Sequence, residues 1–313
     1  MNKKEIEELL AFTKHERKIF MPNEIFEDLV SCEIKNSSHI AFAYSFYYLA
    51  SWLYRYTKYM DYEKYNVKKL KQILGYSKSN KTLDYIIKDG GLLDSIDYTR
   101  SSTNPPMLNY FGDGYVKFTH YSELKDDFKY IPIETNIRHS KIKEPLKGLH
   151  REECAKEEKI LNGTFYEIEN THLISIEIFI ECMSNKDIGC IGFYLYCFLK
   201  YKTDKFPMGV DISLEQITRQ TGIKKTSRDK YLDMLKKYNF ISCIPTDFIV
   251  GMPKEYRRSS RYLVNDISRF KSSKSDVKKR NVKDWKSVEG DYINSNNEKG
   301  KSDLLNGEDL PFI

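Results

Sequence analysis

The sequence lacks the features that would place the protein in a membrane or outside the cell. No apolar run approaches the roughly 20 residues of a membrane-spanning helix, and the best candidate, residues 188–199, is followed by Lys200 and Lys202. The first residues carry Lys and Glu where a signal peptide needs an apolar segment. The six cysteines, at 32, 154, 182, 190, 197 and 243, form no Cys-x-x-Cys motif. We therefore expect a cytoplasmic protein with reduced cysteines.

Motifs for catalysis and metal binding are also missing. The sequence has no Gly-x-x-x-x-Gly-Lys-Ser/Thr loop, no Gly-x-Gly-x-x-Gly turn, no nucleophile elbow and no His-x-His pair. His150 and Cys154 are four residues apart with His139 nearby, but the other ligands of a structural zinc site are absent. We therefore expect no enzyme activity, no cofactor and no metal.

The same apolar skeleton occurs twice in the chain. Each copy opens with an extended entry that contains Glu-Ile-Phe, over 19–26 and 172–179, and continues into an aromatic helix, over 41–53 and 188–199. Apolar and glycine positions then repeat at an offset of 147 and, after two inserted residues, of 149: Val67, Leu70 and Gly75 with Leu214, Ile217 and Gly222; Leu83, Ile86 and Leu92 with Leu232, Leu235 and Ile241. We interpret this as a duplicated domain.

Each copy has the order of a helix-turn-helix followed by a hairpin. In the second copy Ser213 can cap a first helix that ends at Gly222, and Thr226 or Ser227 can cap the second. A strand over 240–244 and a hairpin over 248–264 follow. The first copy predicts helices over 67–74 and 82–88, a strand over 92–98 and a returning strand over 115–118.

This pattern predicts a mainly α protein with small β-wings, an α+β fold of two tandem winged helix-turn-helix domains. The first would cover 1–130 and the second 166–270. A charged connector over 131–165 would be partly helical, with Pro145 in the first turn of a helix over 146–161. Beyond 270 aliphatic residues become scarce, so we expect 271–313 to be mostly disordered.

Basic residues gather in the second copy. Residues 200–261 hold 14 Lys and Arg against seven Asp and Glu, whereas 58–100 hold nine against six. Recognition helices and wings are where winged helices meet phosphates and grooves. Asn can pair bidentately with adenine, which makes Asn80 a candidate for base reading or else a cap. The predicted DNA-binding residues are Lys78, Ser79, Asn80, Lys81, Arg100, Lys224, Lys225, Thr226, Ser227, Arg228, Lys230, Lys254, Arg257, Arg258 and Arg261.

The segment after 268 divides into two parts of opposite charge. Residues 269–286 hold eight bases and two acids, and 289–309 hold six acids and two lysines. A basic arm can follow DNA phosphates, and the acidic end would be repelled from DNA. Its Leu310, Pro311 and Phe312 form a candidate anchor for partner docking. The alternative is that the acids keep the segment soluble.

With these patterns established, the chain resembles plasmid and phage replication initiators built from two winged helices. The entry over 20–26, followed by an aromatic helix and a helix-turn-helix, is similar to the N-terminal domain of RepA-type initiators of low-GC Gram-positive bacteria. The second copy resembles the module of DnaD-like replisome proteins. The resemblance covers about 20–120 and 170–268. It implies binding of double-stranded origin DNA and recruitment of host replication proteins.

The acidic ending over 306–313 resembles the tails of bacterial single-strand-binding proteins, which dock on replication partners, although Ile313 replaces their final Phe. Two other functions stay open. A transcriptional regulator of a mobile element would share the DNA surface but bind a promoter. A winged-helix scaffold would bind protein instead, and the basic second copy argues against that for at least one module.

Overall fold

The protein is an α+β fold, mainly helical with small sheets. The computed structural model describes residues 1–111, 116–124, 141–147, 170–206, 208–277 and 281–290. The helices are α1 (Lys3–Leu10), α2 (Ile25–Ser31), α3 (Ser37–Arg55), α4 (Val67–Ile73), α5 (Asp84–Ile87), α6 (Leu92–Ser95), α7 (Tyr121–Leu124), α9 (Ile176–Ser184), α10 (Gly189–Asp204), α11 (Leu214–Thr221) and α12 (Lys225–Lys237). Short 3-10 helices include η2 (Lys58–Tyr65), η6 (Lys254–Tyr256) and η8 (Trp285–Ser287).

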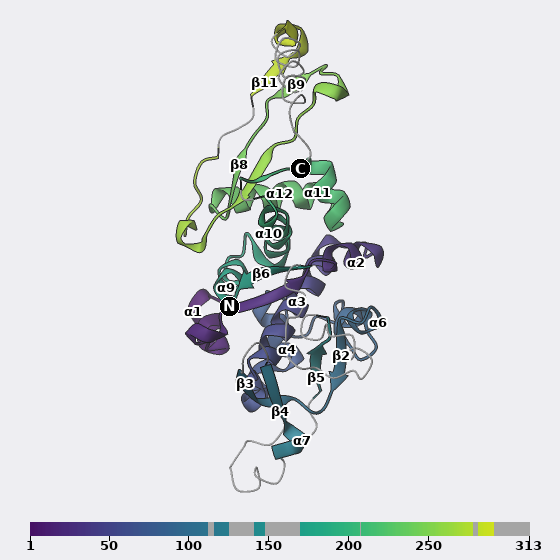
Figure 1. The fold of residues 1–313 in the computed structure, drawn as a ribbon, viewed down its shortest axis with the longest axis vertical. Helices are drawn as coiled ribbons and strands as arrows, with labels where there is room; N and C mark the ends of the chain where they lie inside the picture. Colours follow the sequence, from purple (N-terminus) through teal and green to yellow (C-terminus); the bar gives the residue numbers. More distant parts are fainter. Residues whose placement is uncertain (112–115, 125–140, 148–169, 207, 278–280, 291–313) are drawn as a thin grey trace, which may run out of the picture.

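The strands form five small sheets. The strands are β1 (Lys18–Pro22), β2 (Thr99–Ser102), β3 (Pro106–Phe111), β4 (Val116–His120), β5 (Ile142–Pro145), β6 (Thr171–Ser175), β7 (Val210–Asp211), β8 (Ile241–Ile244), β9 (Phe248–Val250), β10 (Arg261–Val264) and β11 (Val282–Asp284). Four sheets are antiparallel, and β11 runs parallel to β9. Together the elements make an elongated molecule in which the two copies occupy opposite ends (Figure 1).

The entry strands of the two copies pair with each other at the centre of the molecule. β1 and β6 are antiparallel, and Phe20 lies opposite Leu173. The Glu-Ile-Phe segments that follow these strands lie at 24–26 and 177–179, an offset of 153 residues. Phe20 and Leu173 have the same offset and are therefore equivalent positions in the two copies. Two equivalent residues therefore face each other in the ladder. An antiparallel pair with this register relates the two copies by an approximate two-fold axis.

A single aromatic core joins the copies across this axis. α3 and α10, the two aromatic helices, pack against each other next to the β1–β6 pair (Figure 1). Tyr48 meets Phe193 edge-on with ring centroids 5.2 Å apart, and Phe26 contacts Tyr194 at 5.4 Å. Both helices are buried on nearly every face, which is why their sequences are apolar all round. One hydrophobic cluster thus contains side chains of both copies.

The second copy follows the order α10, β7, α11, α12, β8, β9, β10. Its three-stranded sheet has the order β7-β10-β8, with Tyr262 of β10 opposite Cys243 of β8. Ser213 and Gln216 form a capping box at the start of α11, as the sequence predicts for Ser213. Gly222 ends this helix at φ 68°, a left-handed conformation that favours glycine.

The first copy departs from its predicted strands. The strand expected over 92–98 is wrong, because residues 92–95 form α6. The carboxylate of Asp94 accepts hydrogen bonds from the Gly90 N–H and the Thr99 hydroxyl, and this folds the chain back on itself. The sheets are instead β2 with β5 and the hairpin of β3 with β4.

Part of the expected connector belongs to the first copy. Residues 142–145 form the buried strand β5, so Pro145 ends a strand instead of starting a helix. Proline is tolerated there because its missing N–H falls at the end of an edge strand. Most of the predicted helix over 146–161 lies outside the described residues.

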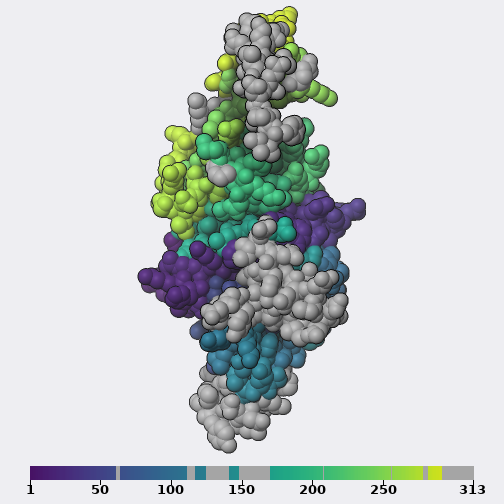
Figure 2. Space-filling view, in the orientation of Figure 1, coloured from purple at the N-terminus to yellow at the C-terminus, as the bar shows by residue number. Residues whose placement is uncertain are grey.

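Part of the segment expected to be disordered forms regular structure. Phe270 stacks on Phe240 with centroids 3.8 Å apart, and the Lys271 N–H donates to the Tyr238 carbonyl. Farther on, β11 pairs with β9, and Trp285 packs against Tyr256 at 5.2 Å. The second copy therefore extends beyond 270. A space-filling view shows its upper part continuing into this extension (Figure 2).

Candidate nucleic-acid interface

The start of α12 carries the densest exposed cluster among the predicted DNA-binding residues. Lys224, Lys225 and Thr226 are exposed, Ser227 is half-buried, and Lys230 is exposed one turn later. The first turn of the helix holds no acidic residue. The positive end of the helix dipole and the positive lysine side chains therefore lie together at the start of α12. This arrangement attracts phosphate.

The turn before α12 is positioned by the first copy. The Lys224 N–H donates to the Ser37 hydroxyl over 2.9 Å. A Cβ added to Gly222 would lie 2.8 Å from Cδ1 of Ile40, so the turn packs closely against the beginning of α3. Ser37 and Ile40 are thus positioning residues that sequence reasoning missed. Ser37 is 187 residues away from Lys224 in the chain, so no local sequence pattern predicts this contact.

Arg228 does not belong to the exposed cluster. We expected it on the outer face of the helix, and this is wrong because only 4% of the residue is exposed. Its Nη1 donates to the Leu214 carbonyl over 2.6 Å and to the Thr218 hydroxyl over 2.8 Å, which ties α12 to α11. Nε and Nη2 donate to the Asp229 carboxylate. Arg228 lies four residues before the buried Leu232, and that spacing is the signal for an inward position.

Several other bases of the second copy are also paired within the protein. Nε and Nη2 of Arg261, on β10, donate to the two carboxylate oxygens of Asp211, on β7, at 2.8 and 2.7 Å. Its hydrogen bonds hold the pKa of Asp211 below the ordinary value. Lys200 and Lys237 each form an ion pair one helical turn away. No described residue forms an ion pair with Lys224, Lys225 or Lys230, so the start of α12 keeps positive charge for a ligand, and further exposed bases lie on the wing.

The hairpin predicted over 248–264 is wrong, because β10 pairs with β7 and β8, whereas β9 pairs with β11. The segment between β9 and β10, called the wing here, presents the other predicted bases. Lys254, Arg257 and Arg258 are exposed along η6 and the residues after it. The Arg257 Nε donates to the Met252 carbonyl over 3.0 Å, which fixes the root of this side chain against the wing. The wing projects away from the centre of the molecule beside β11 (Figure 1).

The first copy offers a weaker surface. Lys78, Ser79 and Lys81 are exposed in the turn between α4 and α5. The carboxamide oxygen of Asn80 accepts hydrogen bonds from the Thr82 N–H and hydroxyl at 2.9 and 2.7 Å, so this side chain holds the turn. α5 has four residues, against thirteen in α12.

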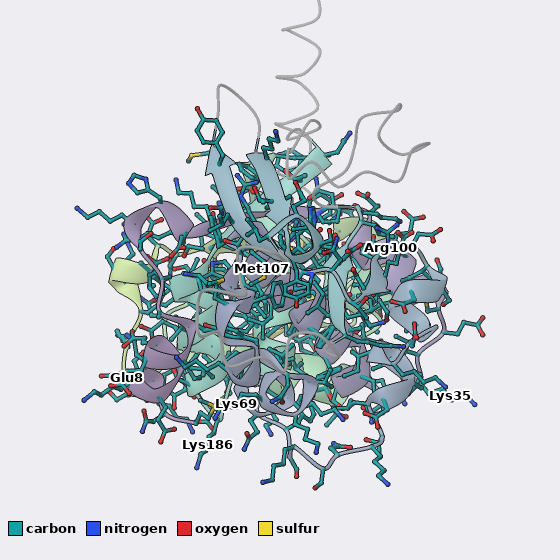
Figure 3. The ribbon with its side chains drawn as sticks, turned by 90° about the horizontal axis from the view of Figure 1, so that it is seen from below. Glu8, Lys35, Lys69, Arg100, Met107 and Lys186 are labelled. Carbon is teal, nitrogen blue, oxygen red and sulfur yellow. The ribbon has the colours of Figure 1, made fainter. Side chains whose placement is uncertain are left out.

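Arg100 lies at the side of the first copy in the view from below (Figure 3). Its Nε and Nη2 both donate to one oxygen of the buried Glu144, across the β2–β5 pair. Leu310, Pro311 and Phe312, as well as His139, His150 and Cys154, lie outside the described residues.

Comparison with family models, with curated proteins and with solved structures finds no match to this chain. Within the described ranges, no helix is long and apolar enough to cross a membrane. The same part of the chain contains no group of three or more His, Cys, Asp or Glu side chains that could hold a metal ion.

Proposed function

We propose that the chain binds double-stranded DNA and acts as a replication initiator that recognises repeated origin sites. The observation that carries the proposal is the second copy. Its element order and its sheet order β7-β10-β8 fit a winged helix with α12 as recognition helix. The lysines at the start of that helix are exposed and form no ion pair with any described residue. The basic wing would contact the backbone beside the groove.

The arrangement of the copies supports a specific binding mode. Because β1 and β6 pair antiparallel with Phe20 opposite Leu173, we expect the proposed DNA-facing elements of the two copies to be related by an approximate two-fold rotation. One chain would therefore meet two inverted, unequal half-sites. The second module would supply most of the affinity, since α5 is short and Arg100 is paired within the protein.

The salt dependence of binding tests this proposal directly. Lys224→Ala, Lys225→Ala and Lys230→Ala should each lower the slope of log affinity against log salt by about 0.9 for duplex DNA. Lys4→Ala is the matched control, because Lys4 is exposed on α1 at the other end of the chain. Equal slopes for the triple variant and wild type would place the duplex elsewhere on the protein.

The biological role needs a second experiment. Selection of bound fragments from random and plasmid DNA should recover repeated sites near an origin. A plasmid that carries those sites should then replicate only with the intact protein. Recovery of promoter sites, with no effect on replication, would instead identify a transcriptional regulator.

One observation favours protein binding by the wing as a second candidate function. Phe248 and Val282 are cross-strand neighbours on β9 and β11, and they are 56% and 71% exposed. Ile244, just before them, is 60% exposed. Exposed apolar groups of this kind are typical of protein contacts. Loss of a pulled-down partner in Phe248→Ser, with DNA affinity unchanged, would support this function.

A further inference from the structure

A cavity of about 700 Å³ opens beside α4 and α5 in the first copy. Its floor is formed by apolar side chains from α3, α4, α5 and β5, among them Phe46, Leu70, Ile87 and Ile142. Its volume lies within the range of small-molecule pockets, about 300–1,000 Å³. None of the predicted DNA contacts explains an apolar hollow of this size.

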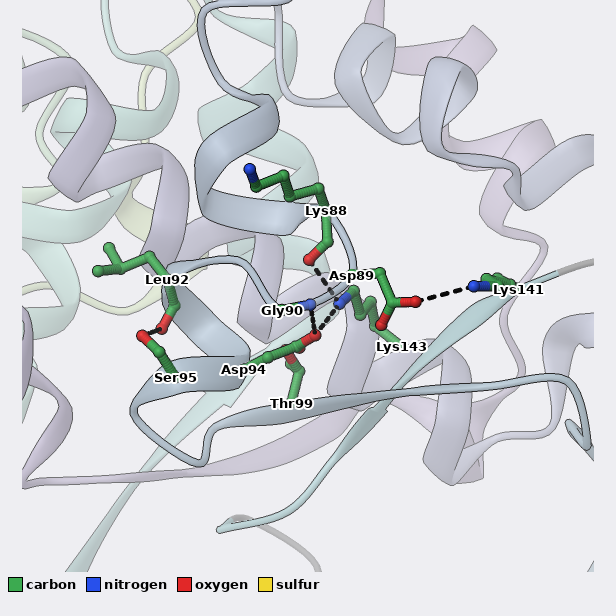
Figure 4. A network of polar contacts seen from close by, with 9 residues as sticks. All are labelled: Lys88, Asp89, Gly90, Leu92, Asp94, Ser95, Thr99, Lys141 and Lys143. Atoms are coloured by element: carbon green, nitrogen blue, oxygen red, sulfur yellow. Dashed lines mark hydrogen bonds and ion pairs between the residues drawn. The ribbon is translucent and has the colours of Figure 1, made fainter.

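Seven lysines line the cavity, and three of them are held by the protein. Lys71 donates to the Asn80 carbonyl and the Asp84 carboxylate. Lys143 donates to the Lys88 carbonyl and to Asp94, as Figure 4 shows.

Lys141 binds Asp89 at 2.8 Å in the same network (Figure 4). These three lysines hold the turn around α5 and the strand β5 in place around the hollow.

The other four lysines of the lining have no ion-pair partner among the residues that the structure describes. Lys68, Lys78, Lys81 and Lys88 are exposed, and no described residue forms an ion pair with their side chains. Asp84 and Asp89, the two acids that line the cavity, are already paired with Lys71 and Lys141. Counting the described residues alone, the mouth therefore carries more positive than negative charge above an apolar floor.

We propose that this cavity binds a nucleoside phosphate, with the base on the apolar floor and the phosphates among the four lysines. A nucleotide combines a planar ring with several negative charges close together, whereas a fatty acid carries a single charge. Lysine ammonium groups bind phosphate as point charges. The nucleotide can be free or part of a single strand, because both present the same chemistry.

This site overlaps the weaker DNA surface of the first copy. Lys78, Ser79 and Lys81 line the cavity and are also predicted DNA contacts. A bound nucleotide would neutralise these lysines, so nucleotide and duplex compete at the first module. The second module is not part of the cavity and keeps its DNA contacts.

The test measures nucleotide binding by the full chain in the absence of DNA. Titration calorimetry with ATP, dAMP, inorganic pyrophosphate and a 5′-phosphorylated oligothymidine separates the sources. ATP should bind more tightly than pyrophosphate if the apolar floor holds the base. Tighter binding of the oligonucleotide than of either free nucleotide would identify a single strand as the natural ligand.

Three variants locate the site. Lys78→Ala and Lys81→Ala should each weaken ATP binding about 5-fold, the effect of one exposed charge pair. Val67→Trp places a ring over the mouth from an exposed position on α4 and should weaken binding about tenfold or more. Lys69→Ala is the matched control, because this lysine lies on α4, as Val67 does, and does not line the cavity. Lys69 is labelled in Figure 3.

The proposal is overturned if none of the four probes binds at millimolar concentration. It is also overturned if Lys69→Ala weakens ATP binding as much as Lys78→Ala, or if pyrophosphate binds as tightly as ATP. These outcomes do not depend on duplex binding, so they are distinguishable from failure of the DNA-binding function. If the protein fails to bind duplex DNA but binds ATP in this pattern, the nucleotide site stands and the DNA-binding proposal fails.

Discussion

His172 should make the contact between the two copies sensitive to acid. It is 1% exposed on β6. The Tyr44 hydroxyl lies 2.6 Å from its Nε2, and Asn23 Oδ1 lies 3.0 Å from its Nδ1. Because an amide oxygen only accepts, Nδ1 carries the proton and the tyrosine hydroxyl donates to Nε2. Burial, with a smaller contribution from the charge of Lys200, lowers the pKa of His172 to about 3.

The lowered pKa sets the sign and the size of the effect. An unfolded histidine has a pKa of about 6.5, so between pH 6.5 and 3 the unfolded chain binds a proton that the folded protein does not. This contribution to the free energy of unfolding is complete above pH 6.5 and falls as the pH falls. Between pH 7 and pH 5 the loss is about 2 kcal/mol from this one residue.

Urea unfolding at pH 7 and pH 5 measures the effect. Wild type should lose about 2 kcal/mol more between the two values than His172→Gln, which cannot titrate but keeps polar groups for Tyr44 and Asn23. His15→Gln, at an exposed position on η1 (Lys14–Glu16), is the control and should behave as wild type does. If His172→Gln shows the same loss as wild type, another group causes it, and the reasoning from burial is refuted.

Three further changes test the assigned roles. Arg228→Ala should lower the free energy of unfolding by about 2–4 kcal/mol in urea titrations, since it leaves buried acceptors on α11 without a donor. A change below 0.5 kcal/mol would contradict the inward position of Arg228. Asn80→Ala should cost about 1 kcal/mol of stability and weaken all DNA sequences equally; loss of preference at a single base would restore it as a base reader. Deletion of 306–313 should leave origin binding intact but abolish replication of a plasmid with that origin, and normal copy number would exclude docking through this end.

Local signals in the sequence predicted α11 well, but the cap predicted at Thr226 or Ser227 is wrong, because α12 begins at Lys225 with Lys224 as its N-cap residue. The cap at Ser213 and the glycine at 222 act on their neighbours, so their effect is visible in a short window. The repeated spacing of apolar residues is explained by burial: Leu83 and Ile86 in the first copy are buried, and so are Leu232 and Leu235 in the second. These residues face the core in both copies because the same helices pack there.

The failures share a physical cause, which is contact between distant residues. β5 exists because residues 142–145 pair with 99–102, far back in the chain. The chain around and after residue 270 is held by two long-range contacts: Phe270 stacks on Phe240, and β11 pairs with β9. An argument from composition does not take such contacts into account. Arg228 was assigned to the surface because of its charge, although buried arginines are stable when their donors are satisfied. Charge alone does not decide which way a helical side chain points.

The two copies differ in the length of their second helix as well as in their sheets. In the second copy α12 runs for thirteen residues and presents its first turn to solvent, whereas α5 in the first copy runs for four. A shortened helix covers less of the core, and the cavity lies beside it. The two copies share one core across the β1–β6 pair. The long helix α12 and the cavity beside α5 therefore lie in different copies, one carrying the residues proposed to bind DNA and the other the proposed nucleotide site.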